Sequence, residues 1–322
     1  MSIAGKILAR LMLNRLIKHI EKIGLIPESQ CGFRPNRGTS DMTFALRQLQ
    51  EKSRLQGVDL YLLFIDFTKA FDTVNREGLW RILVKAGCPG LFVSLISSFY
   101  DNRKVSVREG NDKSPSFGVT SGTKQGCVLA PTLFSIFFYM MLLVAFKGTS
   151  DGVDIKSRFD VGMGRVKTNH FNAPTKVTIS TIRDLLFADD CAVTANTLEG
   201  LQRLSDRFSA AACRFGLIIS IKKTEVLYQP APGEPYVPPV INIEGKQLKA
   251  VETFKYLGST VSNDASLDAE ITSRIARATA AFGRLTKRLW TNRNIRLNTK
   301  IAVYRALSSH CYTCCMEYWL VT

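Results

Sequence analysis

Two short stretches of this 322-residue chain place carboxylates where they could act together on a metal ion. In residues 185–193 the adjacent pair Asp189 and Asp190 has apolar neighbours on both sides, the pattern of a strand, a tight turn and a returning strand. In residues 58–67 a mostly apolar run ends at Asp66, as in a buried strand that carries a carboxylate at its C-terminal end. Like charges in an apolar setting are costly unless a cation lies between them. The aspartates therefore predict a site for Mg²⁺, with Mn²⁺ as the alternative ion.

Each acidic stretch also has a simpler interpretation. An Asp–Asp pair at a turn is most often a solvated turn, and an aspartate after a strand often caps the helix that follows. If both strands instead bring their carboxylates to one or two metal ions, the arrangement suits two-metal phosphoryl transfer. One ion would then activate the attacking oxygen while the other stabilises the leaving group.

Further blocks of residues favour the catalytic interpretation, because together they resemble the reverse transcriptases of LINE-type (non-LTR) retrotransposons. The six blocks, in the family's order, are residues 30–39 (QCGFRPNRGT), 64–74 (FIDFTKAFDTV), 123–131 (TKQGCVLAP), 187–190 (FADD), 216–224 (GLIISIKKT) and 254–258 (FKYLG). Ala188 also resembles this family, since viral RNA-copying polymerases usually carry Gly before the aspartate pair. A single block would be a weak match, whereas six blocks in order are a specific one.

The resemblance implies roles for the residues at the reaction centre. Asp66, Asp189 and Asp190 would be the catalytic carboxylates and would bind two Mg²⁺ ions, with the backbone carbonyl of Phe67 as a further ligand. The incoming dNTP would be contacted by Phe71, Gln125, Gly126 and Lys223 or its neighbour Lys222. Phe71 would act as the aromatic gate that rejects a 2′-hydroxyl, and the lysine would serve the triphosphate and donate a proton to pyrophosphate. On composition alone, Phe71 is equally a core residue, and the two lysines are a solvated charge pair.

The resemblance also implies contacts to the RNA template and the DNA primer. Arg34 and Arg37 would contact template or nucleotide phosphates from the fingers. The primer grip would include Tyr256, Leu257 and Gly258. The thumb would contribute Arg274, Arg277, Arg284 and Arg288.

The charge of the chain agrees with a polyanionic partner. Its net charge is +16 and its pI about 9.6, which favours nucleic acid over a membrane surface. Residues 271–322 hold nine Lys and Arg against one acid, Glu317, a net charge of +8. In the same segment apolar residues recur at helical spacing, with the arginines on another face. A solvated helix face is the usual explanation for charges, but a bound phosphate backbone better explains a face of one sign.

The eight cysteines are scattered and show no disulfide framework, which predicts an intracellular, reducing compartment, either nucleus or cytoplasm. The spacing of Cys311 and Cys314 fits half a zinc site, but no second pair with ligand spacing exists, so we expect reduced cysteines there. Residues 127–146 contain no charge and are long enough to span a bilayer. Because they follow the Gln125–Gly126 motif, we expect a buried palm helix and no membrane partner.

We therefore expect an α+β, right-hand polymerase with helical fingers, an antiparallel-sheet palm and a helical thumb. The expected domains are partial fingers (1–58), a palm (59–228) with fingers elements at about 78–118, a Pro-rich connector with primer-grip strands (229–265) and the thumb (266–322). The sequence gives no indication of oligomeric state.

The expected activity is RNA-directed DNA polymerase (reverse transcriptase) activity. Compared with the family, the chain is expected to be a polymerase-domain fragment without the endonuclease, without the first fingers segment and with a shortened thumb. The first fingers segment carries a basic residue at the triphosphate. The alternative is therefore a catalytically inactive, transposon-derived fragment that only binds nucleic acid.

Overall fold

The computed structural model describes residues 3–101, 104–124, 126–159 and 176–306. These residues divide into two compact units, Met1–Val251 and Glu252–Thr322, which are considered separately below. The boundary between the units falls inside the predicted connector, because the preceding segment pairs with a strand of the first unit. Cys311, Cys314 and Cys315, which we expect to be reduced, and the candidate nucleotide-contact residue Gln125 lie outside the described residues.

A five-stranded sheet lies at the centre of the first unit, in the order β13-β10-β1-β9-β8. The strands are β1 (Leu60–Ile65), β8 (Asp184–Phe187), β9 (Asp190–Ala195), β10 (Glu225–Gln229) and β13 (Lys249–Val251). β1 pairs antiparallel with both β9 and β10, and only β13 runs parallel to its neighbour. In this register Ile65 lies opposite Cys191, so the residue after β1 lies beside the β8–β9 turn.

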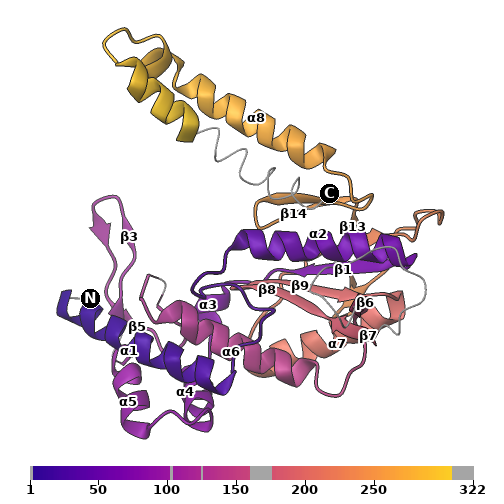
Figure 1. Ribbon diagram of the computed structural model, residues 1–322. Helices are drawn as coiled ribbons and strands as arrows, with labels where there is room; N and C mark the ends of the chain where they lie inside the picture. The colour runs from indigo at the N-terminus through magenta and orange to yellow at the C-terminus, as the bar shows by residue number, and fades with distance from the viewer. Residues whose placement is uncertain (1–2, 102–103, 125, 160–175, 307–322) are drawn as a thin grey trace. The chain divides into compact units, whose positions relative to one another are not determined.

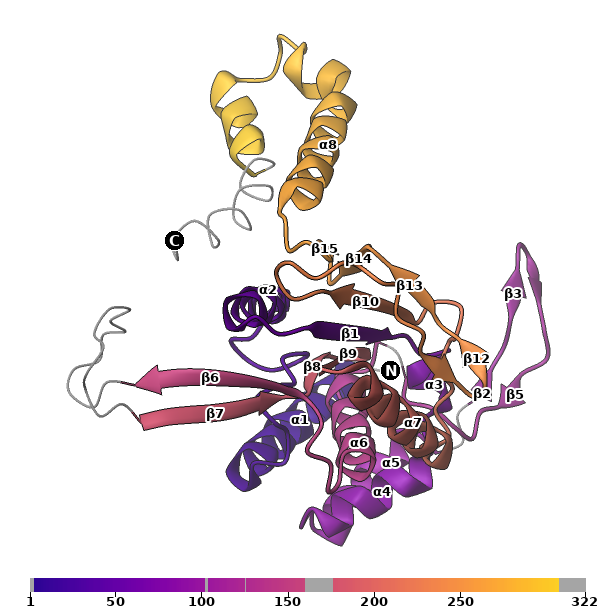
Figure 2. The same cartoon turned by 90° about the vertical axis from the view of Figure 1, so that its right-hand side faces the viewer.

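Helices cover both faces of this sheet, with α2 (Thr39–Gln56) on one side and α6 (Ala130–Ala145) and α7 (Leu198–Phe215) on the other (Figures 1 and 2). The side chain of Thr197 caps α7, and Gly216 ends it at a φ of +75° that suits glycine. Most of α6 is buried, which confirms the predicted buried palm helix. Among the described residues, no helix has both the length and the apolar character needed to cross a membrane.

Among the described residues, the remaining elements of the first unit are four further helices and four two-stranded ribbons. The helices are α1 (Ile3–Ile23), α3 (Ala70–Thr73), α4 (Arg76–Lys85) and α5 (Gly90–Ser98). The ribbons are β2–β5 (Lys104–Val105 and Phe117–Gly118), β3–β4 (Arg108–Glu109 and Asp112–Lys113), β6–β7 (Val153–Phe159 and Lys176–Ile182) and β11–β12 (Asn242–Ile243 and Lys246–Gln247).

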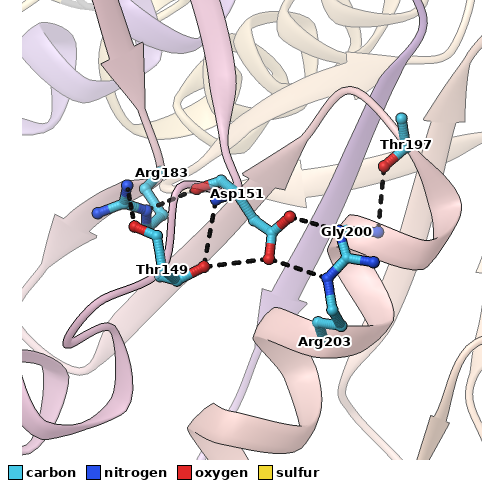
Figure 3. Close-up of polar contacts among 6 residues, drawn as sticks. All are labelled: Thr149, Asp151, Arg183, Thr197, Gly200 and Arg203. Atoms are coloured by element: carbon cyan, nitrogen blue, oxygen red, sulfur yellow. Dashed lines mark hydrogen bonds and ion pairs between the residues drawn. The ribbon is translucent and has the colours of Figure 1, made fainter.

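A polar network fixes the base of the β6–β7 ribbon to α7 (Figure 3). The carboxylate of Asp151 accepts hydrogen bonds from Arg203 Nη2 at 2.5 Å, from Arg203 Nε at 3.1 Å and from the Thr149 hydroxyl at 3.0 Å. The guanidinium of Arg183 donates to the backbone carbonyls of Asp151 and Thr149. The hydrogen bond from Arg203 holds the pKa of Asp151 below its ordinary value.

The second unit contains a β-hairpin and a helical segment. Its elements are β14 (Thr253–Tyr256), β15 (Ser259–Ser262), α8 (Asp268–Arg284) and a short π-helical segment, η1 (Thr286–Trp290). α8 confirms the helix predicted from the spacing of apolar residues. The apolar side chains of this helix are, however, exposed: Ile275 is 61% exposed, Ile271 40% and Phe282 41%.

Candidate active site

The catalytic candidates meet at one end of the central sheet. Phe187 pairs with Asp190, so Ala188 and Asp189 form the two-residue turn between β8 and β9. Asp66 directly follows β1, whose last residue lies opposite the first residues of β9. The structure therefore brings together the two acidic stretches that the sequence separates by more than a third of its length.

The proximity of these carboxylates changes their electrostatics. Partial burial, followed by the negative charges of Asp189 and Asp66, raises the pKa of Asp190 to about 6. Burial, and then the charge of Asp66, also raise the pKa of Asp189. Asp190 is the more exposed of the pair, yet neighbouring protein atoms still displace enough water to disfavour its ionised form. A cation placed among the three side chains would relieve this repulsion.

Lys223 is the cationic side chain that reaches Asp66, with its Nζ 3.4 Å from Asp66 Oδ2. A turn built on the backbone of Asp66 places it there: Ser220 N donates to Asp66 O at 2.8 Å, and Asp66 N donates to the Thr224 hydroxyl at 3.3 Å. The sequence left Lys222 and Lys223 as alternatives, and this ion pair favours Lys223.

The donor set fits a divalent metal ion. Asp66 Oδ2 is buried and accepts no hydrogen bond from the described residues, so the ion pair with Lys223 is its only polar contact there. All candidate ligands are oxygens, as Mg²⁺ and Mn²⁺ prefer. Within the described ranges, no three acidic, His or Cys side chains are already close enough together to enclose an ion. The ring of Phe67, whose carbonyl is the further expected ligand, packs against Phe138 and anchors this backbone.

Phe71, a candidate nucleotide-contact residue, lies on α3, which follows Asp66 closely in the chain. The ring of Phe71 is partly exposed and stacks on Phe134 of α6, with the ring centroids 4.4 Å apart. One face of Phe71 therefore packs against the core, as the simpler interpretation predicts, and the ring is not fully enclosed. Gly126 has a φ of +82°, which explains the glycine at that position.

The candidate template contacts of the fingers already have protein partners. Glu28 forms ion pairs with Arg34, at 3.2 Å, and with Arg37. The hydrogen bond from Arg34 is the largest cause of a pKa of Glu28 below its ordinary value. Arg37 remains the more exposed of the two arginines. In the second unit, Leu257 and Gly258 form the β14–β15 turn, while Tyr256 is buried.

The predicted nucleic-acid contact of Arg274 needs correction. Its guanidinium pairs with the buried Glu270, donates to the Ser259 hydroxyl at 3.0 Å and is only 12% exposed. Arg274 therefore joins α8 to the β14–β15 hairpin inside the second unit. Arg277, Arg284 and Arg288 are exposed, and for these three the nucleic-acid contact stays a prediction.

Three residues at the site have roles that the sequence analysis did not assign. Gln30 hydrogen bonds to the backbone of Ala188, and the Thr224 hydroxyl holds the backbone of Asp66. Arg76 donates to the carbonyls of Tyr100, Val119, Ser121 and Gly122, which fixes the segment leading to Gly126. Gln30 lies within the first of the six blocks that resemble reverse transcriptases, and this place in the sequence was the only signal that could have pointed to it.

Comparisons with known proteins agree with this geometry. The family model described as reverse transcriptase (RNA-dependent DNA polymerase) matches residues 1–261. The chain is 28% identical over 315 residues to the RNA-directed DNA polymerase from mobile element jockey of Drosophila funebris. It is 27% identical over 312 residues to the probable RNA-directed DNA polymerase from transposon BS of Drosophila melanogaster. Each alignment covers 94% of this chain but only 30% and 31%, respectively, of the two relatives.

A solved structure of telomerase from Candida tropicalis, in complex with a TWJ fragment of telomeric RNA, matches with a TM-score of 0.50. The sequences are 12% identical, and the match covers 97% of this chain and 46% of that one. This likeness and the family match confirm the expected α+β, right-hand polymerase fold. The chain belongs to the reverse transcriptase family.

Proposed function

We propose that this chain is the polymerase part of a non-LTR retrotransposon protein and copies an RNA template by adding dNTPs to a primer 3′-hydroxyl. The observation that carries the proposal is the meeting of Asp66, Asp189 and Asp190 at one end of the palm sheet. The relatives named above, RNA-directed DNA polymerases of mobile elements, support the same activity.

We infer that two divalent ions, Mg²⁺ or alternatively Mn²⁺, bind to the three carboxylates and to the carbonyl of Phe67. When bound, such ions activate the attacking hydroxyl and stabilise the charge of the leaving pyrophosphate. Lys223 lies beside Asp66 and, in this proposal, donates a proton to the pyrophosphate.

The proposed contacts to the substrates are among those that the resemblance implies. Phe71, Gln125 and Gly126 contact the incoming dNTP, with the partly exposed ring of Phe71 against its sugar. Template and primer contact Arg37, the β14–β15 turn and the exposed arginines of α8 and η1. Fingers, palm, connector and thumb are proposed at the boundaries expected from the sequence. The free cysteines among the described residues support an intracellular, reducing compartment.

The test is primer extension on an RNA template with dNTPs and Mg²⁺, comparing the chain with an Asp189→Asn/Asp190→Asn double variant. Extension by the parent and none by the variant is the expected result, because the variant cannot hold the ions. If neither protein extends the primer but both retain duplex binding, the proposal is overturned in favour of an inactive nucleic-acid-binding fragment. Omission of divalent ions should abolish extension by the parent.

A further inference from the structure

Gln30 is a fully buried polar residue in contact with the turn that carries the catalytic aspartates. Its side-chain oxygen accepts hydrogen bonds from the backbone N–H of Ala188 at 3.1 Å and of Gly32 at 2.8 Å. Its side-chain nitrogen donates to the backbone carbonyl of Ala188 at 3.3 Å. One carboxamide therefore binds both backbone polar groups of the residue that precedes Asp189.

The backbone of Ala188 is in a conformation that needs such support. Its φ is +60°, in the region that residues other than Gly, Asn and Asp rarely occupy. Ala188 is the first central residue of a two-residue hairpin turn, and Asp189 does not share its positive φ. This is the pattern of a type II′ turn, which favours glycine at that first position. The strained residue is adjacent to a candidate metal ligand, so relaxation of the turn would move that ligand.

The segment around Gln30 is built against the edge of the palm sheet. Leu186 N donates to Ser29 O, and Cys31 N donates to Leu186 O, both at 3.0 Å, so this segment runs parallel to β8. A Cβ at Gly32 would lie 2.2 Å from Ala188 N, so only glycine permits this approach to the turn. The fingers loop and the catalytic turn are therefore packed backbone to backbone, with the Gln30 carboxamide between them.

We infer that Gln30 is a positioning residue for polymerisation. Its carboxamide holds Ala188 in the left-handed conformation and thereby fixes the backbone of the turn from which Asp189 and Asp190 bind divalent ions together with Asp66. The inference rests on the proposed function and adds a residue outside the metal-binding set. It predicts that any change which lets position 188 adopt this conformation freely will reduce the need for Gln30.

The test is a double-mutant cycle of Gln30→Met and Ala188→Gly. Methionine keeps the length of Gln30 but makes none of its hydrogen bonds, whereas glycine at 188 adopts the positive φ without steric cost. Gln30→Met should lower the rate of single-nucleotide incorporation by about tenfold or more and leave duplex affinity unchanged. It should also weaken binding of Mn²⁺, measured by electron paramagnetic resonance of the free ion. Adding Ala188→Gly should restore most of both losses.

Gln50 provides the matched control, because it is an equally buried glutamine on α2, away from the turn. Gln50→Met should lower thermal stability, and Ala188→Gly should not rescue any loss of activity that it causes. The inference would be overturned if Gln30→Met bound Mn²⁺ with the same affinity as the parent. It would also be overturned if Ala188→Gly rescued neither glutamine variant. If Gln30→Met does not fold, Gln30→Leu takes its place, because leucine is also uncharged and also makes none of the side-chain hydrogen bonds.

The Mn²⁺ titration also separates this inference from the proposed function. A parent chain that extends no primer would overturn the proposed function. The difference in Mn²⁺ affinity between Gln30→Met and the double variant would still decide the role of Gln30.

Discussion

The reaction proposed here depends on a cation beside a carboxylate, and Lys223 is the side chain that provides one. Its ammonium lies 3.4 Å from Asp66, on a turn whose backbone is hydrogen-bonded to that aspartate. The neighbouring Lys222 is exposed on the same turn, so the two lysines share sequence context and differ in position. They form a natural pair for comparison.

Lys223→Met should lower the rate of single-nucleotide incorporation by about a hundredfold, because a positioned general acid contributes roughly that much. Lys222→Met should remain within about threefold of the parent rate, since loss of an exposed charge changes little. Pre-steady-state incorporation with saturating dNTP measures both. Equal effects of the two substitutions would show that the pair acts through net charge and not through the contact with Asp66.

Phe71 combines a packing contact with a proposed contact to the sugar. Phe71→Val should raise incorporation of ribonucleotides relative to deoxyribonucleotides by about tenfold, because a smaller side chain leaves room for a 2′-hydroxyl. The ratio of kcat/KM for matched dNTP and rNTP measures this selectivity. Phe134→Leu disturbs the same aromatic stack from the buried side and should destabilise the fold without relaxing selectivity. A similar loss of selectivity in both variants would assign Phe71 to the core alone.

At the scale of elements, the base of the β6–β7 ribbon depends on the carboxylate of Asp151 (Figure 3). Asp151→Asn should lower the free energy of unfolding by about 1–2 kcal/mol at neutral pH, because it weakens the charged hydrogen bonds from Arg203. Asp154 lies nearby, is exposed and accepts from the Thr181 hydroxyl, so Asp154→Asn is the matched control and should cost less. Urea denaturation of the three proteins makes the comparison.

The pH dependence of the Asp151 effect has a definite sign. The folded pKa of Asp151 is lowered from 3.8, so its charged form stabilises the fold. That contribution is complete above pH 3.8 and is lost as the pH falls through the folded pKa. The difference in stability between parent and Asp151→Asn should therefore shrink in acid, and a difference that grows there would exclude the ion pair as its cause.

The elements that the sequence predicted are those with strong local patterns. β1 is a continuous apolar run, the β8–β9 hairpin has two aspartates at its turn, and α6 is uncharged throughout. Gln30 and Thr224 were not predicted because their hydrogen-bond partners, Ala188 and Asp66, are each 158 residues away and are backbone groups. A residue's type carries no information about a partner that only the folded chain brings near.

The same limit explains the correction at Arg274. Helical spacing places its side chain with the other arginines of α8, and a face that carries only positive charge favours binding of a polyanionic partner. Its partner Glu270, one turn earlier, is buried against the backbone of Thr260 on the adjacent hairpin. Periodicity identified the face of the helix, but only the packing of the hairpin determined which arginine remains exposed.

Over the whole molecule, the charge is unevenly distributed, since half of the net +16 lies in residues 271–322. Binding to a nucleic-acid backbone releases counterions, so affinity should fall steeply with salt. Each exposed arginine that neutralises a phosphate adds about 0.9 to the slope of log affinity against log salt concentration. The second unit is therefore expected to supply much of this dependence.

Replacement of Arg277, Arg284 and Arg288 by Gln should decrease that slope by about 2–3 and weaken binding to all duplex sequences equally. Fluorescence anisotropy of an RNA–DNA duplex over a series of salt concentrations measures it. Replacement of the exposed Arg81, Lys85 and Arg214 of the first unit by Gln removes the same charge from residues with no proposed contact. If both triple variants decrease the slope equally, overall charge and not the face of α8 governs binding. A decrease confined to the first variant would identify that face as the duplex contact.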